Sequence, residues 1–246
     1  YLPTTAEEEK VQATTRLTCV YENASPSPKS PLTATVLGTD LTVLPQASEE
    51  LAAFTPGSVV SFLLTADGKI AGAMAPTSTA KSTLVGVVTE AADGTATVET
   101  VMANAAGQKL TFTGKVSSSA ERLVGQLVTI SSSRSGYLTL TQVSSSGTAG
   151  VLNVAQRTLG GEQLSSHVAL YERTQNGVPK RITWGQITVA SVPANKISYV
   201  GTDLSGAIDV IILNDVTGDG YIYGYIRSEQ EKHEVPGLNP GDDPSE

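Results

Sequence analysis

The stretch ISYVGTDLSGAIDVIILNDVTGDGYIYGYI, residues 197–226, contains three short runs rich in Val, Ile and Tyr, separated by two turns of Gly and Asp. β-Branched and aromatic residues favour strands, and Gly, Asn and Asp between such runs favour tight turns. The stretch therefore predicts a β-meander. Most of the chain outside it varies the pattern of its first hairpin, which predicts an all-β protein.

The composition favours several thin cores rather than one thick core. Of the 246 residues, 39% are apolar, only 5% are aromatic and only 16% are charged, against roughly 25% charged in typical soluble domains. Ser, Thr, Ala and Gly take the place of the charges. This length accommodates one large β domain or two to three small ones.

The net charge of −8 is concentrated near the two ends. Residues 1–12 carry −2 and residues 228–246 carry −5, which leaves −1 for the body. Nucleic-acid binding needs clustered Lys and Arg, and the chain has no such cluster. We therefore expect no nucleic-acid partner, and we expect residues 228–246, which lack periodicity, to form a disordered acidic tail.

A single cysteine, Cys19, excludes an intrachain disulfide. The absence of an intrachain disulfide is compatible with the cytosol and equally with a Gram-positive type of cell surface. No apolar run reaches the length of a membrane-spanning helix, so we expect no membrane insertion.

An internal repeat organises the chain. The runs at residues 59–62, 127–130 and 197–200 are offset by 68 and 70 residues. Each is followed six residues later by a turn glycine and two residues after that by an aliphatic residue. These pairs are Gly68 and Ile70, Gly136 and Leu138, and Gly206 and Ile208. In the first copy Asp67-Gly68 predicts a type I′ hairpin turn. The units are expected to open with strands at residues 33–37, 84–88 and 149–154.

Closing a sheet into a barrel removes its exposed edges, so the repeat predicts three tandem small β-barrel-like (SH3/OB-like) domains with one or two short helical turns. The helical turns are expected at residues 47–54, with Ser48 as N-cap, and at residues 120–124. The predicted division is an N-terminal strand and Pro-rich linker (1–31), three β domains (32–82, 83–145 and 146–227) and the acidic tail (228–246).

Candidate chemistry is sparse. The loop DVTGDG at residues 215–220 resembles the start of a calcium loop, but Thr217 replaces a ligand and Ile226 stands where a bidentate Glu is needed, so a tight turn is predicted. Asp203 and Asp209 are formal candidates for a glycosidase carboxylate pair, although Asp is expected at the turn that they flank. We expect no catalytic residue, no metal site and no cofactor.

Aromatic residues give the one candidate ligand surface. Tyr221, Tyr223 and Tyr225 alternate, so they point to one face of a strand. Such a row stacks on sugar rings in some carbohydrate-binding modules, or it lines the wall of a barrel. Trp184 is the only tryptophan, and it acts either as a ligand platform or as a plug in the core or between domains.

Residues 168–226 carry a family resemblance. The segments VALYER, ITWGQI, VPANKISYV and DVIILNDVTGDGYIYGYI resemble part of the large surface proteins of gut Firmicutes that contain S-layer homology domains. The resemblance implies an exported, wall-associated protein whose β domains lie beside the anchoring modules. The chain has no S-layer homology motif, so anchoring is not carried over, and the family supplies no catalytic residue.

The expected function is a non-enzymatic structural or adhesive segment of a cell-surface, S-layer-associated protein. Its expected location is extracellular, in the cell wall or S-layer. Its expected partners are other segments of the same surface protein or polymers of the cell envelope. The alternative is a carbohydrate-binding module that uses the aromatic row.

Overall fold

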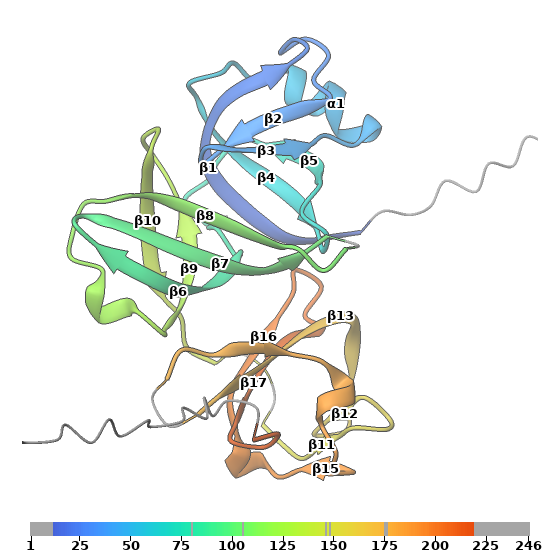
Figure 1. Cartoon of the computed structure of the whole chain (residues 1–246). Coiled ribbons are helices and arrows are strands. Elements are labelled where there is room, and N and C mark those ends of the chain that lie inside the picture. The colour runs from blue at the N-terminus through green and yellow to red at the C-terminus, as the bar shows by residue number, and fades with distance from the viewer. Residues whose placement is uncertain are drawn as a thin grey trace, which may run out of the picture.

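A computed structural model describes residues 12–79, 81–104, 106–145, 147, 149–174 and 177–218. Within these ranges the protein has seventeen strands, one α-helix and three 3₁₀ helices, and the strands form three sheets. The all-β prediction is confirmed. Figure 1 shows three units that follow one another along the chain, with the third packed below the first two.

The first unit is a five-stranded sheet in the order β3-β2-β1-β4-β5, with one helix between β3 and β4. A parallel bridge between Val43 and Ile70 links the end of β3 to β5. The helix begins at Pro45, a residue suited to a first helical turn. The elements are β1 (Ala13–Ser25), β2 (Thr33–Val36), β3 (Thr39–Thr42), α1 (Pro45–Ala52), β4 (Val59–Thr65) and β5 (Ile70–Met74).

The second unit is a closed barrel in the order β10-β8-β7-β6-β9. β10 runs parallel to β8, and all its other pairings are antiparallel. A short 3₁₀ helix, η1, takes the place that α1 has in the first unit. The elements are β6 (Val85–Ala92), β7 (Thr95–Ala103), β8 (Lys109–Val116), η1 (Glu121–Leu123), β9 (Leu127–Ser131) and β10 (Tyr137–Gln142).

The first two units share strand order and also register. Cys19 of β1 lies opposite Val60 of β4, and Gly86 of β6 lies opposite Val128 of β9. The two pairs are related by shifts of 67 and 68 residues, so in the first two units the repeat predicted from the hairpins extends to the strand that pairs with the first strand of the hairpin.

The third unit is a seven-stranded sheet in which β13 and β17 pair in parallel, as β8 and β10 do. The sheet does not close among the described residues, so three tandem SH3/OB-like barrels stay a prediction. The elements are β11 (Leu152–Asn153), β12 (Thr158–Leu159), β13 (Glu162–Arg173), β14 (Lys180–Ile182), η2 (Trp184–Gln186), β15 (Ser191–Val192), η3 (Ala194–Lys196), β16 (Ile197–Thr202) and β17 (Ile208–Asn214).

The first unit begins earlier than the sequence suggested. β1 lies in the middle of its sheet, paired with both β2 and β4, so the division at residue 31 separates the central strand from its neighbours. The expected opening strand at residues 33–37 is β2. Ser48 lies inside α1 rather than at its N-cap, which is Leu44, and the Ser48 hydroxyl donates to the carbonyl of Pro31 at 3.2 Å.

The hairpin at Asp67-Gly68 is confirmed, but its turn is not type I′. Only Gly68 has a positive φ, 82°. Its N–H donates to the Thr65 carbonyl at 3.0 Å, and the Thr65 N–H donates to the Lys69 carbonyl at 2.9 Å, which gives a three-residue turn with a bulge. Positive φ at two successive residues occurs instead at Leu37-Gly38 (49° and 75°), at Asp93-Gly94 (51° and 72°) and at Gly160-Gly161 (59° and 90°).

Apolar packing continues from unit to unit. One cluster of buried side chains extends through the first and second units, and a second fills the third unit. A third cluster joins the second unit to the third, with Val87 and Leu127 on one side and Tyr171 and Ile212 on the other. Among the described residues no helix has the length and hydrophobicity needed to cross a membrane.

Candidate functional site

The expected aromatic surface is only partly visible. Tyr221, Tyr223 and Tyr225 lie outside the described residues. Trp184 is half-buried against the core of the third unit, and the guanidinium carbon of Arg157 lies 4.4 Å from the centroid of its ring. One face of the indole is therefore covered by a cation from its own unit.

The turn that resembles a calcium loop forms hydrogen bonds to a buried carboxylate from a neighbouring strand. Glu172 of β13 is 2% exposed and accepts hydrogen bonds from the backbone N–H groups of Val216 and Thr217, the latter at 2.6 Å, and from the Thr217 hydroxyl. A turn that directs donors inward binds an anionic group, whereas calcium needs oxygen acceptors. Within the described ranges no three His, Cys, Asp or Glu residues cluster as metal ligands would.

A cavity of about 230 Å³ lies where the three units and their two connecting segments meet. The N–H of Leu204, in the turn between β16 and β17, donates to the Thr14 carbonyl at 3.0 Å and so brings the third unit against β1 beside this cavity. We call it the junction cavity. Its lining includes Thr15, Thr83, Val101, Ser144, Tyr199 and Asp209.

Asp209 is the one carboxylate in the lining of the junction cavity. It is 6% exposed, and burial, together with the nearby charge of Asp203, raises its pKa to about 7. Burial and the Asp209 charge raise the pKa of Tyr199 to about 12. At neutral pH the cavity thus contains a neutral phenol and a carboxyl group close to its titration midpoint.

Asp203 is occupied by its own turn. Its Oδ1 accepts hydrogen bonds from the N–H of Ser205 at 2.8 Å, the N–H of Ala207 at 3.1 Å and the Ser205 hydroxyl at 2.6 Å. Its Oδ2 lies 3.8 Å from Nε2 of His167. Asp203 does not line the junction cavity, so the two acids named from the sequence are neighbours that face different partners.

A second cavity, of about 180 Å³, adjoins the first and shares Val143, Ser144 and Tyr199 with it. Arg173 lines this second cavity. Its Nη2 donates to the Gly125 carbonyl at 3.0 Å, and its Nε is buried without a hydrogen-bond partner. Burial lowers the pKa of the guanidinium.

The chain matches no protein-family model, and neither a curated protein nor a solved structure matches it. The resemblance of residues 168–226 to S-layer-associated surface proteins therefore stays a prediction.

Sequence reasoning placed Asp209 at a turn and gave Glu172 no role. In both cases the signal was a lone acid within an apolar run, IDVIIL and VALYER. A buried acid among strand-forming residues indicates a hydrogen-bonded partner or a perturbed pKa.

Proposed function

We propose that the chain is a non-enzymatic structural segment of a larger cell-surface protein, in which three β units are fixed to one another as a rigid spacer or assembly surface. The observation that carries the proposal is the apolar and hydrogen-bonded packing between successive units. Domains of one chain usually move relative to one another unless their interface is large and hydrophobic.

Hydrogen bonds join the segment between the first and second units to β1. The N–H of Arg16 on β1 donates to the Thr83 hydroxyl at 2.8 Å, and the Thr83 N–H donates to the Arg16 carbonyl at 2.8 Å. The Thr18 N–H donates to the Ser82 hydroxyl at 2.7 Å. The Ser/Thr-rich connector therefore runs along β1 and leaves little freedom between the first and second units.

Hydrogen bonds also join the segment between the second and third units to β16. The N–H of Val200 on β16 donates to the Ser145 hydroxyl at 3.0 Å, and the Gly147 N–H donates to the Val200 carbonyl at 3.1 Å. Arg181 extends from β14 to the Val101 carbonyl of β7 at 2.8 Å. Backbone and side-chain hydrogen bonds thus support the apolar contact between the second and third units.

The proposal of a cell-surface location rests on the resemblance of residues 168–226. In that location, the proposed partners are other segments of the same protein or polymers of the cell envelope. The test is a binding and turnover screen of the full chain against purified peptidoglycan, wall glycans and S-layer fragments. We expect that the chain either binds one of these polymers or leaves them unchanged, and that no soluble product is released. Release of sugars or peptides from any polymer would overturn the non-enzymatic role.

The same screen separates the structural role from the carbohydrate-binding alternative. The variant Tyr223→Ala removes the centre of the aromatic row. Its matched control is Tyr137→Ala, which removes a tyrosine of β10 whose ring centroid lies 3.4 Å from the guanidinium carbon of Arg134. Glycan binding that is lost in the first variant and kept in the second would favour the carbohydrate-binding module.

A further inference from the structure

The lining of the junction cavity contains a carboxylate and no basic side chain among the described residues. Asp209 is the only carboxylate among them. His167 lines a smaller cavity of about 20 Å³ that also touches Asp209, but its Nε2 lies 3.8 Å from Asp203. A buried carboxylate without a cation is costly, and a bound cation would remove that cost.

A hydroxyl group in the lining of the same two cavities as Asp209 lacks a hydrogen-bond partner. Thr15 lines both the junction cavity and the small cavity, as Asp209 does. The residue is 4% exposed, and its Oγ1 is buried without a hydrogen bond. Buried hydroxyls are nearly always bonded, so this oxygen is an unsatisfied acceptor in the wall of the two cavities.

The rest of the lining combines four valines with six Ser or Thr residues, one tyrosine and one glycine. The cavity volume of about 230 Å³ corresponds to roughly seven water-sized groups. An anion would be repelled by Asp209. A divalent metal would need more oxygen ligands than one carboxylate supplies. The valines are Val85, Val101, Val143 and Val210.

We propose that the junction cavity binds a small alkylammonium ion, with Asp209 as its counter-ion, the Thr15 hydroxyl as a second acceptor and the valine side chains around its alkyl group. This binding activity goes beyond the structural role and does not depend on it. Because the ligand would contact all three units, it would also hold them together.

The test is a calorimetric titration of the full chain with n-butylammonium chloride, with n-butanol as the neutral analogue of the same shape, at pH 8 and constant sodium chloride. We expect the ammonium ion to bind at least tenfold more tightly than the alcohol. At pH 6 its affinity should fall about tenfold, because a carboxyl group with a pKa of about 7 is then largely protonated.

Three variants locate the binding. Asp209→Asn keeps the shape of the side chain and should abolish the preference for the ammonium ion. Asp93→Asn removes an exposed carboxylate from the turn between β6 and β7 and should change nothing. Val101→Phe fills the cavity without altering its charge and should abolish binding, with the thermal unfolding curve as the check on folding.

Failure to bind n-butylammonium would overturn the proposal. So would equal affinity for the alcohol, or unchanged ammonium binding in Asp209→Asn. Binding that persists in Val101→Phe would place the cation on the acidic surface instead of in the cavity and would also overturn it.

Discussion

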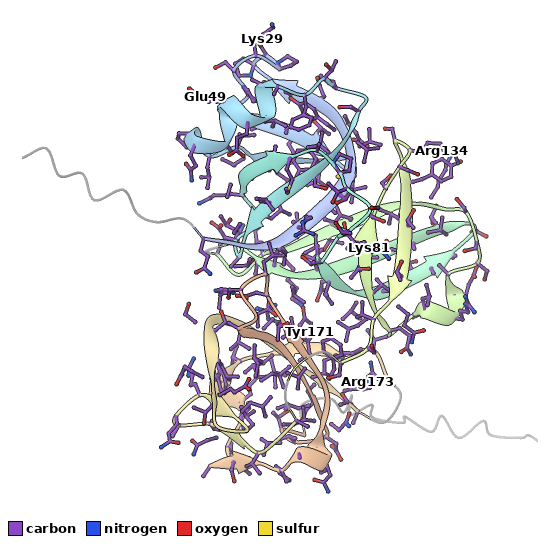
Figure 2. The ribbon with its side chains drawn as sticks, turned by 180° about the vertical axis from the view of Figure 1, so that it is seen from behind. Lys29, Glu49, Lys81, Arg134, Tyr171 and Arg173 are labelled. Atoms are coloured by element: carbon purple, nitrogen blue, oxygen red, sulfur yellow. The ribbon has the colours of Figure 1, made fainter. Side chains whose placement is uncertain are left out.

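The hydroxyl of Tyr171, on β13 of the third unit, donates a hydrogen bond to the carbonyl of Thr100, on β7 of the second unit, at 3.4 Å. Tyr171 is fully buried, and Figure 2 shows it at the face of the third unit that lies toward the second. The guanidinium carbon of Arg181 lies 5.4 Å from the centroid of its ring. One aromatic side chain thus takes part in the apolar contact between the two units and also forms a hydrogen bond to the backbone of β7.

Truncating that side chain should loosen the contact between the second and third units. We expect Tyr171→Ala to lower the free energy of unfolding by about 3–5 kcal/mol, because it leaves a large cavity. Tyr171→Phe removes only the hydroxyl and should cost about 1 kcal/mol. Denaturant unfolding measures both values. A loss below 1 kcal/mol for Tyr171→Ala would mean that the units are joined elsewhere.

Asp209 should make the protein less stable as the pH rises from 4 to 7. The unfolded chain releases this proton near the ordinary pKa of 3.8, whereas the folded chain holds it until about pH 7. Between these values the folded state binds more protons, so the free energy of unfolding falls with increasing pH, by up to about 4 kcal/mol. Asp203, Tyr199 and His167 are the titratable groups near it.

The measurement is the difference in unfolding free energy between Asp209→Asn and the parent chain at pH 4 and at pH 8, because the difference cancels the titration of distant groups. The variant should gain stability relative to the parent as the pH rises and level off above about pH 7. A difference that does not change with pH would show that Asp209 titrates normally.

The Glu172 carboxylate should stabilise the end of β17. Glu172→Gln removes the charge that strengthens the hydrogen bonds from the N–H groups of Val216 and Thr217, and it replaces the oxygen that accepts from the Thr217 hydroxyl with an amide NH₂ group. We expect a loss of about 2–3 kcal/mol in the free energy of unfolding. Glu49→Gln, at an exposed position on α1 (Figure 2), is the matched control and should change it by less than about 0.5 kcal/mol. Equal effects in both variants would refute this role.

Gly86 should tolerate no side chain. A Cβ at this position would lie 2.5 Å from Cγ1 of Val98 and 2.9 Å from the carbonyl of Glu99. We expect Gly86→Ala to destabilise the barrel by about 2–3 kcal/mol through overpacking. At Gly185 the nearest atom to a Cβ would be the Thr183 hydroxyl oxygen at 4.0 Å, so Gly185→Ala should leave the thermal midpoint nearly unchanged. A tolerated Gly86→Ala would indicate a looser barrel.

Local patterns were enough to predict the hairpins, because alternation and turn glycines act over a few residues. They did not place β1 in the middle of the first sheet, since its pairing with β4 joins residues such as Leu17 and Phe62 that lie 45 positions apart. Prolines after β1 suggested a linker, yet the strand continues to Ser25 and the Pro26 ring lies just beyond its end. Long-range pairing, unlike turn chemistry, leaves no local signal.

The candidate site was less predictable than the fold. Asp203 and Asp209 occupy similar positions beside one turn in the sequence, but one caps that turn and the other lines a cavity. The cavity that Asp209 lines also includes Thr15, which comes from a strand almost two hundred residues earlier. Sequence spacing alone does not encode which face of a turn a neighbouring unit covers.

The central claim, that the three units form one rigid body, is tested most directly by the distance between spin labels on the first and third units. The double variant Thr42→Cys and Lys180→Cys places labels at exposed strand positions on β3 and β14. Cys19 is fully buried, and burial raises the pKa of its thiol, so it should not react. Electron–electron double resonance on the full chain should give one narrow distance distribution. A broad or multiple distribution would contradict a rigid body.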